Sequence, residues 1–594
     1  MITMKTKLHK LASLLLAFAL TLCLALPAGA VGGDGVAAAS ISPNSEGSIT
    51  VSGAENGVTV YVYKLMDVNV DATAGQPQEP VYSWVDAVAG WVRTHYSNYI
   101  GAAQFDTEPA DNSVKEDFST ASAEDVAEFY DALAAAIRSG GANGVTLNPA
   151  NTSGTIATDG SCTIENLAMG NYLVLIEGGM KVYRPSAVNL VPEWKEVDGT
   201  SEWVLSDAPV ELKSSDLTLI KQVYDGTITT GVTPDWGETA QVAIGDTVTF
   251  KLTAPVPNYP ENALHDGYEI SDNLPAGLTL GNVTVNGVKN GTPSTSTPLP
   301  EGENDAYVLT KADSTATRPT GGQNANVTFN LEFDYDKIKD YDKIEVTYTA
   351  TVNADIKVIG QDSNTNGNIN TAYLDYNNNP YESVAEDGSP NWKTAQYTAT
   401  VFTYGMEITK TDDAQQANPL TGAEFTLHKA GADGNATGNA LTFVEIGTGS
   451  GTYRLAKTDE SNAKSNLVVG GDNADTMKGV LKISGLDVDT YILTETKAPD
   501  SYVKPAQPFK ITISDEKTIG SENNTIPNGK VEFTENETER ETDGYVRQTI
   551  PNTKGFTLPT TGGMGTVLFT AGGVLLMGAG LVVLVLFLRR RTSR

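Results

Sequence analysis

The most constraining feature of this sequence is a set of short runs in which apolar and polar residues alternate. Clear runs have apolar residues at Val58, Val60 and Val62, at Val248, Phe250 and Leu252, and at Ile344, Val346, Tyr348, Ala350 and Val352. A period of two places alternate side chains on opposite faces of a β-strand. Gly, Asn, Asp and Pro separate the runs, as is typical of antiparallel sandwiches. The sequence therefore predicts a mainly β fold of tandem, immunoglobulin-like β-sandwich domains.

The chain of 594 residues is too long for one core, since a domain takes about 150 residues. Composition shifts and turn clusters predict boundaries near 214 and 404. The expected parts are a leader at 1–30, module one at 31–213, module two at 214–403, module three at 404–556 and a terminal segment at 557–594.

Helices are expected in module one and at the C-terminus. Ser122 can cap a helix from Ala123 to Arg138, and a second amphipathic stretch runs from about Trp84 to Tyr99. The segment 286–325, rich in Thr, Pro, Gly and Asn, is expected to form exposed surface loops.

Composition excludes several function classes. The chain has 73 Asp and Glu against 40 Lys and Arg. Without the seven basic residues of 1–30 and 562–594, which hold no acid, residues 31–561 carry 33 − 73 = −40. A protein with this negative charge repels nucleic acid.

The cysteine and histidine content also limits the function. Cys162 could pair only with Cys23, which lies in the leader, and this argues against disulfides. Outside the leader, the histidines are His95, His265 and His428, one in each module. Because they are scattered, we expect no metal, no cofactor and no enzyme turnover.

The N-terminus has the pattern of a secretory signal peptide. A basic start precedes the apolar run Leu11–Leu26, and Ala28-Gly29-Ala30 forms a small-residue cleavage site before Val31. The alternative is an N-terminal membrane anchor, although the apolar run is shorter than the roughly 20 residues that a bilayer-spanning helix needs.

The C-terminus combines three signals in order. The pentapeptide Leu558-Pro559-Thr560-Thr561-Gly562 precedes an apolar run from Val567 to Leu588 and the basic end Arg589-Arg590-Arg591. Such a run can span a bilayer, and the arginines hold its end in the cytoplasm. The order resembles the LPXTG cell-wall sorting signal of Gram-positive surface proteins, in which a sortase cleaves between Thr561 and Gly562. This resemblance implies transient membrane insertion before attachment to peptidoglycan; the alternative is a permanent single-pass anchor.

Two lysines are predicted to point into cores. Lys221 shares its parity with Leu217 and Leu219, and Lys410 with Met406 and Ile408. A buried ammonium is costly, and loss of its proton leaves a nucleophilic amine.

Carboxyls and amides occur at matching parity. Asp272 lies on the face of Tyr268 and Ile270, and Glu495 on that of Tyr491 and Leu493; Asn370 and Asn552 lie near the last strands. A buried carboxyl has a raised pKa and can stay protonated. It would polarise the amide, the amine would attack, and a Lys-Asn isopeptide bond would remain as ammonia leaves. The alternative is ordinary solvated residues, and Asn364, Asn366 and Asn368 share the parity of Asn370.

Specific motifs resemble those of pilins. Pro419-Leu420-Thr421-Gly422-Ala423-Glu424-Phe425 and Glu495-Thr496-Lys497-Ala498-Pro499, the latter like a pilin E-box, make module three similar to the SpaA-type prealbumin-like (CnaB-like) domain. Asp272-Asn273-Leu274-Pro275-Ala276-Gly277-Leu278 and Asn370-Thr371-Ala372-Tyr373-Leu374 make module two resemble the isopeptide-forming domain of fimbrial shaft pilins. Module one is similar to the N-terminal pilin domain.

The resemblance implies a major shaft subunit of a sortase-assembled pilus. It implies bonds Lys221–Asn370 and Lys410–Asn552, with Asp272 and Glu495 as the catalytic carboxyls. It also implies that Lys213 attacks the sortase acyl-enzyme, although Trp203 lies ten positions before it, where the family motif has nine. The implied partners are a sortase, identical subunits, a peptidoglycan precursor, minor pilins and a ligand on host or bacterial surfaces. The alternatives are a minor or basal pilin and a singly anchored adhesin.

Overall fold

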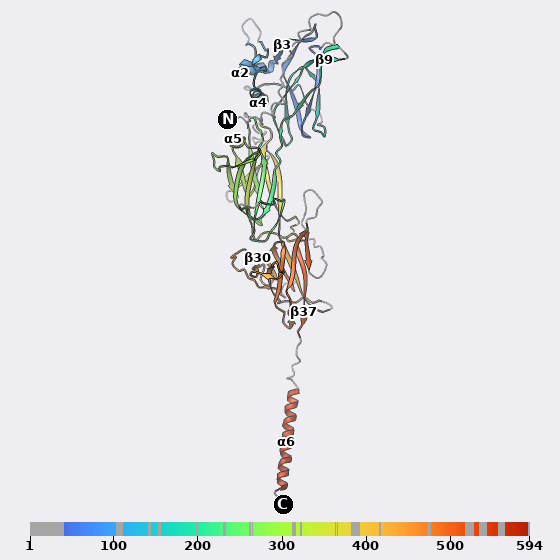
Figure 1. The fold of residues 1–594 in the computed structure, drawn as a ribbon, viewed down its shortest axis with the longest axis vertical. Coiled ribbons are helices and arrows are strands. Elements are labelled where there is room, and N and C mark those ends of the chain that lie inside the picture. Colours follow the sequence, from blue (N-terminus) through green and yellow to red (C-terminus); the bar gives the residue numbers. More distant parts are fainter. Residues whose placement is uncertain are drawn as a thin grey trace. The chain divides into compact units, whose positions relative to one another are not determined.

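Figure 1 draws the computed structural model, whose chain divides into two compact units. The first comprises Met1–Ala240, Asp246–Asp355 and Asn368–Val401, and the second Gln241–Gly245, Ile356–Gly367 and Phe402–Arg594. The structure describes residues 41–591 apart from gaps at 103–110, 141–143, 153–155, 198–199, 230–232, 261–262, 264, 312–315, 321–322, 363, 365, 382–391, 415–416, 472–476, 517–527, 534–542 and 556–564. The predicted leader and the pentapeptide 558–562 lie outside the described residues.

Module one is built on two main sheets. One has the order β3-β2-β6-β8, with β4 beside β2, and the other β11-β1-β5. Short pairs join β7 to β12 and β9 to β10. The strands are β1 Glu46–Ser52, β2 Thr59–Asp71, β3 Gln76–Trp84, β4 Asn151–Thr152, β5 Cys162–Ala168, β6 Gly170–Glu177, β7 Val182–Tyr183, β8 Ser186–Leu190, β9 Pro192–Val197, β10 Thr200–Leu205, β11 Ala208–Glu211 and β12 Ser214–Ser215.

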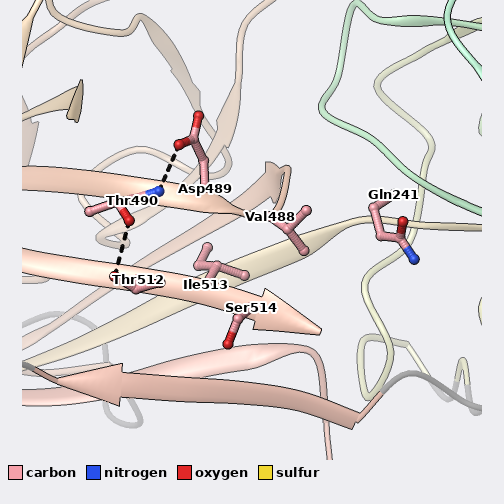
Figure 2. Close-up of a pocket in the computed structure, with 7 residues that line it drawn as sticks. All are labelled: Gln241, Val488, Asp489, Thr490, Thr512, Ile513 and Ser514. Carbon is pink, nitrogen blue, oxygen red and sulfur yellow. Dashed lines mark hydrogen bonds between the residues drawn. The ribbon is translucent and has the colours of Figure 1, made fainter. Parts of the chain in front are cut away.

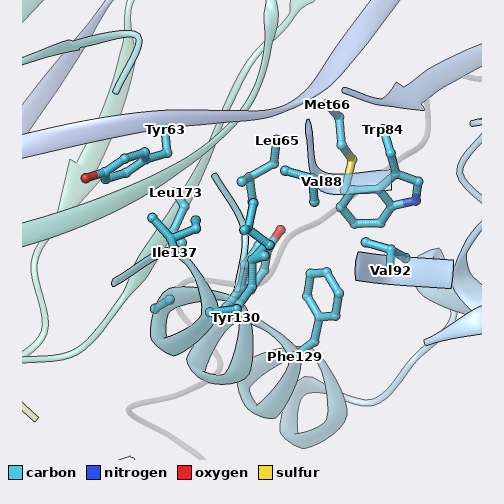
Figure 3. Packing of buried hydrophobic residues seen from close by; sticks show 14 of the residues in the cluster. Tyr63, Leu65, Met66, Trp84, Val88, Val92, Phe129, Tyr130, Ile137 and Leu173 are labelled. Atoms are coloured by element: carbon cyan, nitrogen blue, oxygen red, sulfur yellow. The ribbon is translucent and has the colours of Figure 1, made fainter. Parts of the chain in front are cut away.

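The helices of module one confirm the predicted periodicity. Helix α4 spans Ala123–Ser139, and Ser122 with Asp125 forms a capping box at its start. The second amphipathic stretch forms α2, Asp86–His95, and η1, Ser97–Tyr99; a short α3 spans Glu116–Ser119. The apolar face of α4 packs Phe129 and Tyr130 toward the core around Trp84 (Figure 3).

Module two is a sandwich of two larger sheets, ordered β13-β15-β23-β17-β18 and β14-β25-β24-β16-β22-β19. A hairpin β20-β21 and the short helix α5, Tyr335–Ile338, are added to it. The strands are β13 Ile220–Asp225, β14 Thr239–Gln241, β15 Thr247–Pro255, β16 Tyr268–Asn273, β17 Leu278–Lys289, β18 Thr295–Pro298, β19 Tyr307–Lys311, β20 Thr317–Thr320, β21 Gln323–Asn326, β22 Phe329–Phe333, β23 Lys343–Val352, β24 Asn368–Asn377 and β25 Trp392–Phe402.

The prediction that 286–325 forms exposed loops was wrong in part. The segment contributes the end of β17 and strands β18 to β21. Arg318 is buried, and its guanidinium donates to the Asp375 carboxylate at 2.9 Å and 2.5 Å. The polar residues of this segment therefore include a buried arginine, whose ion-pair partner lies 57 residues away in the sequence.

The second unit is also a two-sheet sandwich, ordered β29-β30-β32-β26-β37-β34 and β28-β27-β33-β35-β36, with β31 beside β27. Its first strand, β26, runs parallel to its last, β37. The strands are β26 Tyr404–Asp412, β27 Glu424–Ala430, β28 Ala436–Thr437, β29 Phe443–Glu445, β30 Thr452–Leu455, β31 Leu467–Val468, β32 Val480–Leu486, β33 Asp489–Lys497, β34 Tyr502–Val503, β35 Phe509–Glu516, β36 Asn528–Phe533 and β37 Tyr545–Lys554.

Two short segments from module two belong to this second unit. Val242 donates its amide to the Phe402 carbonyl, and Gly544 donates its amide to the Ile359 carbonyl. Ile359 is part of the same apolar core as Met406. The predicted boundaries at 213 and 403 remain predictions.

The chain ends in α6, Gly565–Arg591. Its segment Val567–Arg591 is long and apolar enough to cross a membrane, and the protein itself buries none of it. This agrees with the predicted span, since a helix with apolar side chains all round needs lipid or protein around it.

Candidate functional site

Lys221 is completely buried in module two, as its strand parity predicts. It lies on β13 opposite Leu252 of β15, and its Nζ sits 5.2 Å from the Phe250 ring centroid. Burial lowers the pKa of Lys221 to about 8, although the nearby Asp272 acts in the opposite direction. The side chain is therefore much closer to a neutral amine at physiological pH than a solvated lysine is.

Asp272 reaches Lys221 from the other sheet. It lies on β16, is completely buried, and its Oδ2 is 2.5 Å from Lys221 Nζ. Burial raises the pKa of Asp272, against the opposing effects of Lys221 and of hydrogen bonds. Because amine and carboxyl are shifted in opposite directions, the pair is biased toward its neutral form.

Asn370 is the asparagine that the structure brings to this cluster. On β24 it lies diagonally from Asp272 on the same sheet face, since Asp272 faces Ala372. It is completely buried, and its Nδ2 donates to the Tyr348 hydroxyl at 2.9 Å. The three other candidates lie elsewhere: Asn368 donates to the Val401 carbonyl, Asn364 to the Lys357 carbonyl, and Asn366 is exposed.

Two buried oxygens of this cluster have no hydrogen-bond partner among the described residues. They are Asp272 Oδ1 and Asn370 Oδ1. The amide of Asn370 interacts with the Asp272 carboxyl, and a buried polar atom normally finds a partner. One proton on Asp272 Oδ1 would give each oxygen its partner, as donor and as acceptor.

Sequence reasoning missed Tyr348, which joins the acid to the amide. Its hydroxyl donates to Asp272 Oδ2 at 2.7 Å and accepts from Asn370 Nδ2. Tyr348 lies on β23 opposite Phe250. The available signal was its inward parity in the run Ile344, Val346, Tyr348, because a core tyrosine needs a partner for its hydroxyl.

Module three holds a second cluster of the same residue types. Lys410, Glu495 and Asn552 are all buried. Lys410 lies opposite Ile550 in the parallel pairing of β26 and β37, so Asn552 follows two residues later on the same face. Lys410 Nζ donates to Asn552 Oδ1 and, at 2.9 Å, to the Ile550 carbonyl.

Glu495 approaches this pair from β33 in the facing sheet. Asn552 Nδ2 donates to Glu495 Oε1 at 2.7 Å, and Lys410 Nζ is 3.5 Å from Glu495 Oε2. Burial lowers the pKa of Lys410. Each cluster thus combines an amine, a carboxyl and a carboxamide in an interior without bulk water, which is the set that amide exchange requires.

Lys213 lies between β11 and β12 and is half-buried. Its carbonyl accepts from the Arg184 amide at 3.0 Å. Burial, with the Arg184 cation beside it, lowers the pKa of Lys213, while Asp131 acts in the opposite direction. Its predicted partner Thr561 lies outside the described residues.

A separate pocket opens on the second unit beside β33 and β35 (Figure 2). Its lining residues are Gln241, Val488, Asp489, Thr490, Thr512, Ile513 and Ser514. The one carboxylate among them, Asp489, is paired with Lys429 at 2.9 Å. This lining does not have the composition of an acid–base catalytic site.

Comparisons with known proteins agree with the predicted C-terminal anchor and with module three. Residues 405–526 match the family SpaA, a prealbumin-like fold domain, and residues 550–593 match the LPXTG cell wall anchor motif. The trypsin-resistant surface T6 protein of Streptococcus pyogenes serotype M6 is 25% identical, over 74% of this chain and 83% of that protein. Fimbrial subunit type 1 of Actinomyces viscosus is 24% identical, over 63% of this chain and 66% of that protein.

A solved structure shares the fold. The T6 backbone pilin of serotype M6 Streptococcus pyogenes, described as a modular three-domain structure decorated with variable loops and extensions, has a TM-score of 0.50 at 18% identity. The match covers 87% of this chain and all of that one. The fold and the anchor define the class: this is an LPXTG cell-wall-anchored surface protein of tandem β-sandwich domains. More particularly, it carries a SpaA-type prealbumin-like domain and is similar to fimbrial subunits.

Proposed function

We propose that this protein is the structural shaft subunit of a covalently polymerised cell-surface pilus. The observation that carries the proposal is the presence of two fully buried lysine–carboxyl–asparagine clusters in tandem sandwich modules. All six side chains are buried, so they have no access to a diffusing substrate. Groups buried in this way react with each other once and strengthen the fold, which suits a fibre and not an enzyme that turns over.

Each cluster forms one isopeptide bond in this proposal. The neutral lysine amine attacks Cγ of the asparagine. In module two, a protonated Asp272 hydrogen-bonds the amide oxygen of Asn370 as negative charge develops there, and in module three Glu495 contacts the amide nitrogen of Asn552. A proton passes from the lysine nitrogen to the asparagine nitrogen, which leaves as ammonia. An amide joins Lys221 to Asn370 and Lys410 to Asn552, without a cofactor.

The two bonds join different parts of the fold. The bond in module two would connect the facing sheets, because Lys221 lies on β13 and Asn370 on β24. The bond in module three would connect the first and last strands, which are parallel neighbours. That bond closes a loop of 552 − 410 = 142 residues. A tensile load entering at β26 would then reach β37 across one covalent bond.

Assembly uses the chain's ends. A sortase cleaves between Thr561 and Gly562, and the amine of Lys213 in the next subunit takes the acyl group. A peptidoglycan precursor accepts the last subunit, and minor pilins and surface ligands complete the partners. The relatives named as fimbrial subunits and the LPXTG match support this assignment.

The half-burial of Lys213 favours one second candidate. If the amine is not presented to the sortase, the protein is attached to peptidoglycan singly, as an adhesin or a minor or basal pilin. The anchor and both internal bonds are the same in this alternative.

Intact mass of the mature segment 31–561 tests the internal chemistry. Two bonds lower the mass by two ammonia molecules, about 34 Da below the sequence mass. An unshifted mass would remove both bonds and, with them, the proposed shaft mechanism.

A further inference from the structure

We propose that Tyr348 is a catalytic residue of the module-two bond, passing a proton from Asp272 to the leaving nitrogen of Asn370. The proposal rests on the proposed isopeptide chemistry and adds a residue that distinguishes module two from module three.

The hydrogen bonds form an unbroken chain from the nucleophile to the leaving group. Lys221 Nζ lies 2.5 Å from Asp272 Oδ2, and the Tyr348 hydroxyl donates to the same oxygen at 2.7 Å. The same hydroxyl accepts from Asn370 Nδ2 at 2.9 Å. The nucleophilic nitrogen, the carboxyl and the leaving nitrogen are therefore linked in one chain, and Tyr348 lies between the last two.

Module three needs no such intermediary. There the carboxyl contacts the leaving nitrogen directly, because Asn552 Nδ2 donates to Glu495 Oε1 at 2.7 Å. In module two the Tyr348 hydroxyl contacts the leaving nitrogen at 2.9 Å. The bridging phenol is thus a feature of the module-two cluster.

The proton steps balance. Before the reaction, the planar amide nitrogen of Asn370 is a donor, and the hydroxyl accepts from it. Attack by Lys221 makes that nitrogen pyramidal and basic, and the proton on Asp272 Oδ1 passes to the negatively charged oxygen of Asn370. Lys221 Nζ then gives a proton to Asp272 Oδ2, and the hydroxyl of Tyr348 rotates, gives its own proton to the leaving nitrogen and takes the one on Oδ2. The C–N bond breaks, ammonia leaves, and the Asn370 oxygen returns its proton to Asp272 Oδ1 as the new amide forms.

The surroundings hold the hydroxyl in place and keep it protonated. The Tyr348 ring stacks on Phe250 with centroids 5.2 Å apart and meets Phe329 edge-on at 5.1 Å. Burial, with Asp272 beside it, raises the pKa of Tyr348 well above its usual range. Its side chain is 1% exposed, so bulk water cannot easily replace its hydroxyl in the relay.

Tyr348→Phe in the full chain tests this role, since it removes one oxygen and keeps the ring packing. The control is Tyr268→Phe, another buried tyrosine of module two, whose hydroxyl donates to the Pro255 carbonyl. Cell-free synthesis followed by denaturing quench and peptide mapping gives the fraction of each bond against time, at pH 6.5, 7.5 and 8.5.

We expect Tyr348→Phe to slow the module-two bond by about tenfold or more and to change its pH profile. The module-three bond and Tyr268→Phe should both follow wild type. Equal rates and profiles for Tyr348→Phe and Tyr268→Phe would overturn the relay. Wild-type protein that forms neither bond would instead overturn the proposed function.

A second measurement applies even if Tyr348→Phe does not fold. Global incorporation of 3-fluorotyrosine keeps every hydroxyl and makes the phenol more acidic. The ratio of module-two to module-three bond rates should then change by about threefold or more, because only module two uses a phenol. An unchanged ratio would contradict the proposal.

Discussion

Lys221 and Asp272 come from opposite sheets of one sandwich, and their side chains meet at 2.5 Å in a core where both are fully buried. An ion pair in such a place has a large desolvation penalty. The opposite pKa shifts of the two groups favour the neutral pair, and a neutral amine beside an amide is a reactant. The predictions below follow from this relationship.

Asp272→Ala should stop the module-two bond and leave the other. The amine and amide remain, but no carboxyl polarises the amide or moves protons. Intact mass should rise by about 17 Da relative to wild type, after correction for the substitution. Asp266→Ala removes an exposed carboxylate of the same module and should keep the full mass loss of about 34 Da that two bonds give. The same full mass loss in Asp272→Ala would show that the Asp272 carboxyl is dispensable.

Lys410→Met should weaken module three. The linked loop has 142 residues, and the loop-closure model gives about 5 kcal/mol for a cross-link of that length. We expect a lower midpoint for the second unit in urea unfolding, and faster cleavage by trypsin within 404–554. Lys429→Met removes a half-exposed lysine of the same unit and should leave the midpoint near that of wild type. An unchanged midpoint for Lys410→Met would mean that no cross-link had stabilised this module.

Asn370→Ala should make module two's stability depend on pH. Lys221 then stays a free amine whose folded-state pKa is about 8, against an ordinary 10.5. Between these values the unfolded chain binds a proton that the folded chain does not. The free energy of unfolding therefore rises with pH across this window, by about 3 kcal/mol at most, and is unaffected by this group below pH 8.

Wild type is the control for Asn370→Ala. In wild type the Lys221 nitrogen is part of the isopeptide amide and does not titrate. Urea unfolding at pH 8, 9 and 10 should show the stability gap between wild type and Asn370→Ala narrowing as pH rises. A gap that stays constant would mean that Lys221 is not a depressed amine in the unlinked fold.

Lys213→Ala should abolish polymerisation if the shaft assignment holds. Cell-wall extracts of the wild-type strain should show high-mass ladders that resist boiling in SDS, and the variant should show monomer only. Lys195→Ala removes an exposed lysine of the same module and should keep the ladders. Ladders in Lys213→Ala would assign the linkage to another lysine. The absence of ladders from the wild-type strain would instead favour the singly anchored alternatives.

Strand parity predicted most of the site. It placed Lys221, Lys410, Asp272 and Glu495 inside because a period of two is a local property of a strand. Parity did not distinguish Asn370 from Asn364, Asn366 and Asn368, which share it. Asn364 and Asn366 lie before β24, which begins at Asn368. Where that strand begins depends on its pairing with β16 and β25.

Contacts between distant strands could not be predicted. Tyr348 lies opposite Phe250 because β23 pairs with β15 in one register. A single sequence does not give cross-strand register, so it could not predict that Tyr348 bridges the acid and the amide. The composition of 286–325 predicts surface loops, and it cannot indicate that Arg318 pairs with Asp375 on another strand. The charges that act on the pKa of Lys213 come from Arg184 and Asp131, which are distant in the sequence and approach it only in the fold.

Tandem mass spectrometry of a proteolytic digest of the purified protein tests the central claim most directly. We predict two branched peptides, one joining Lys221 to Asn370 and one joining Lys410 to Asn552, each about 17 Da lighter than the sum of its linear parts. Linear peptides carrying unmodified Lys221 and Lys410, with no branched species, would contradict the account.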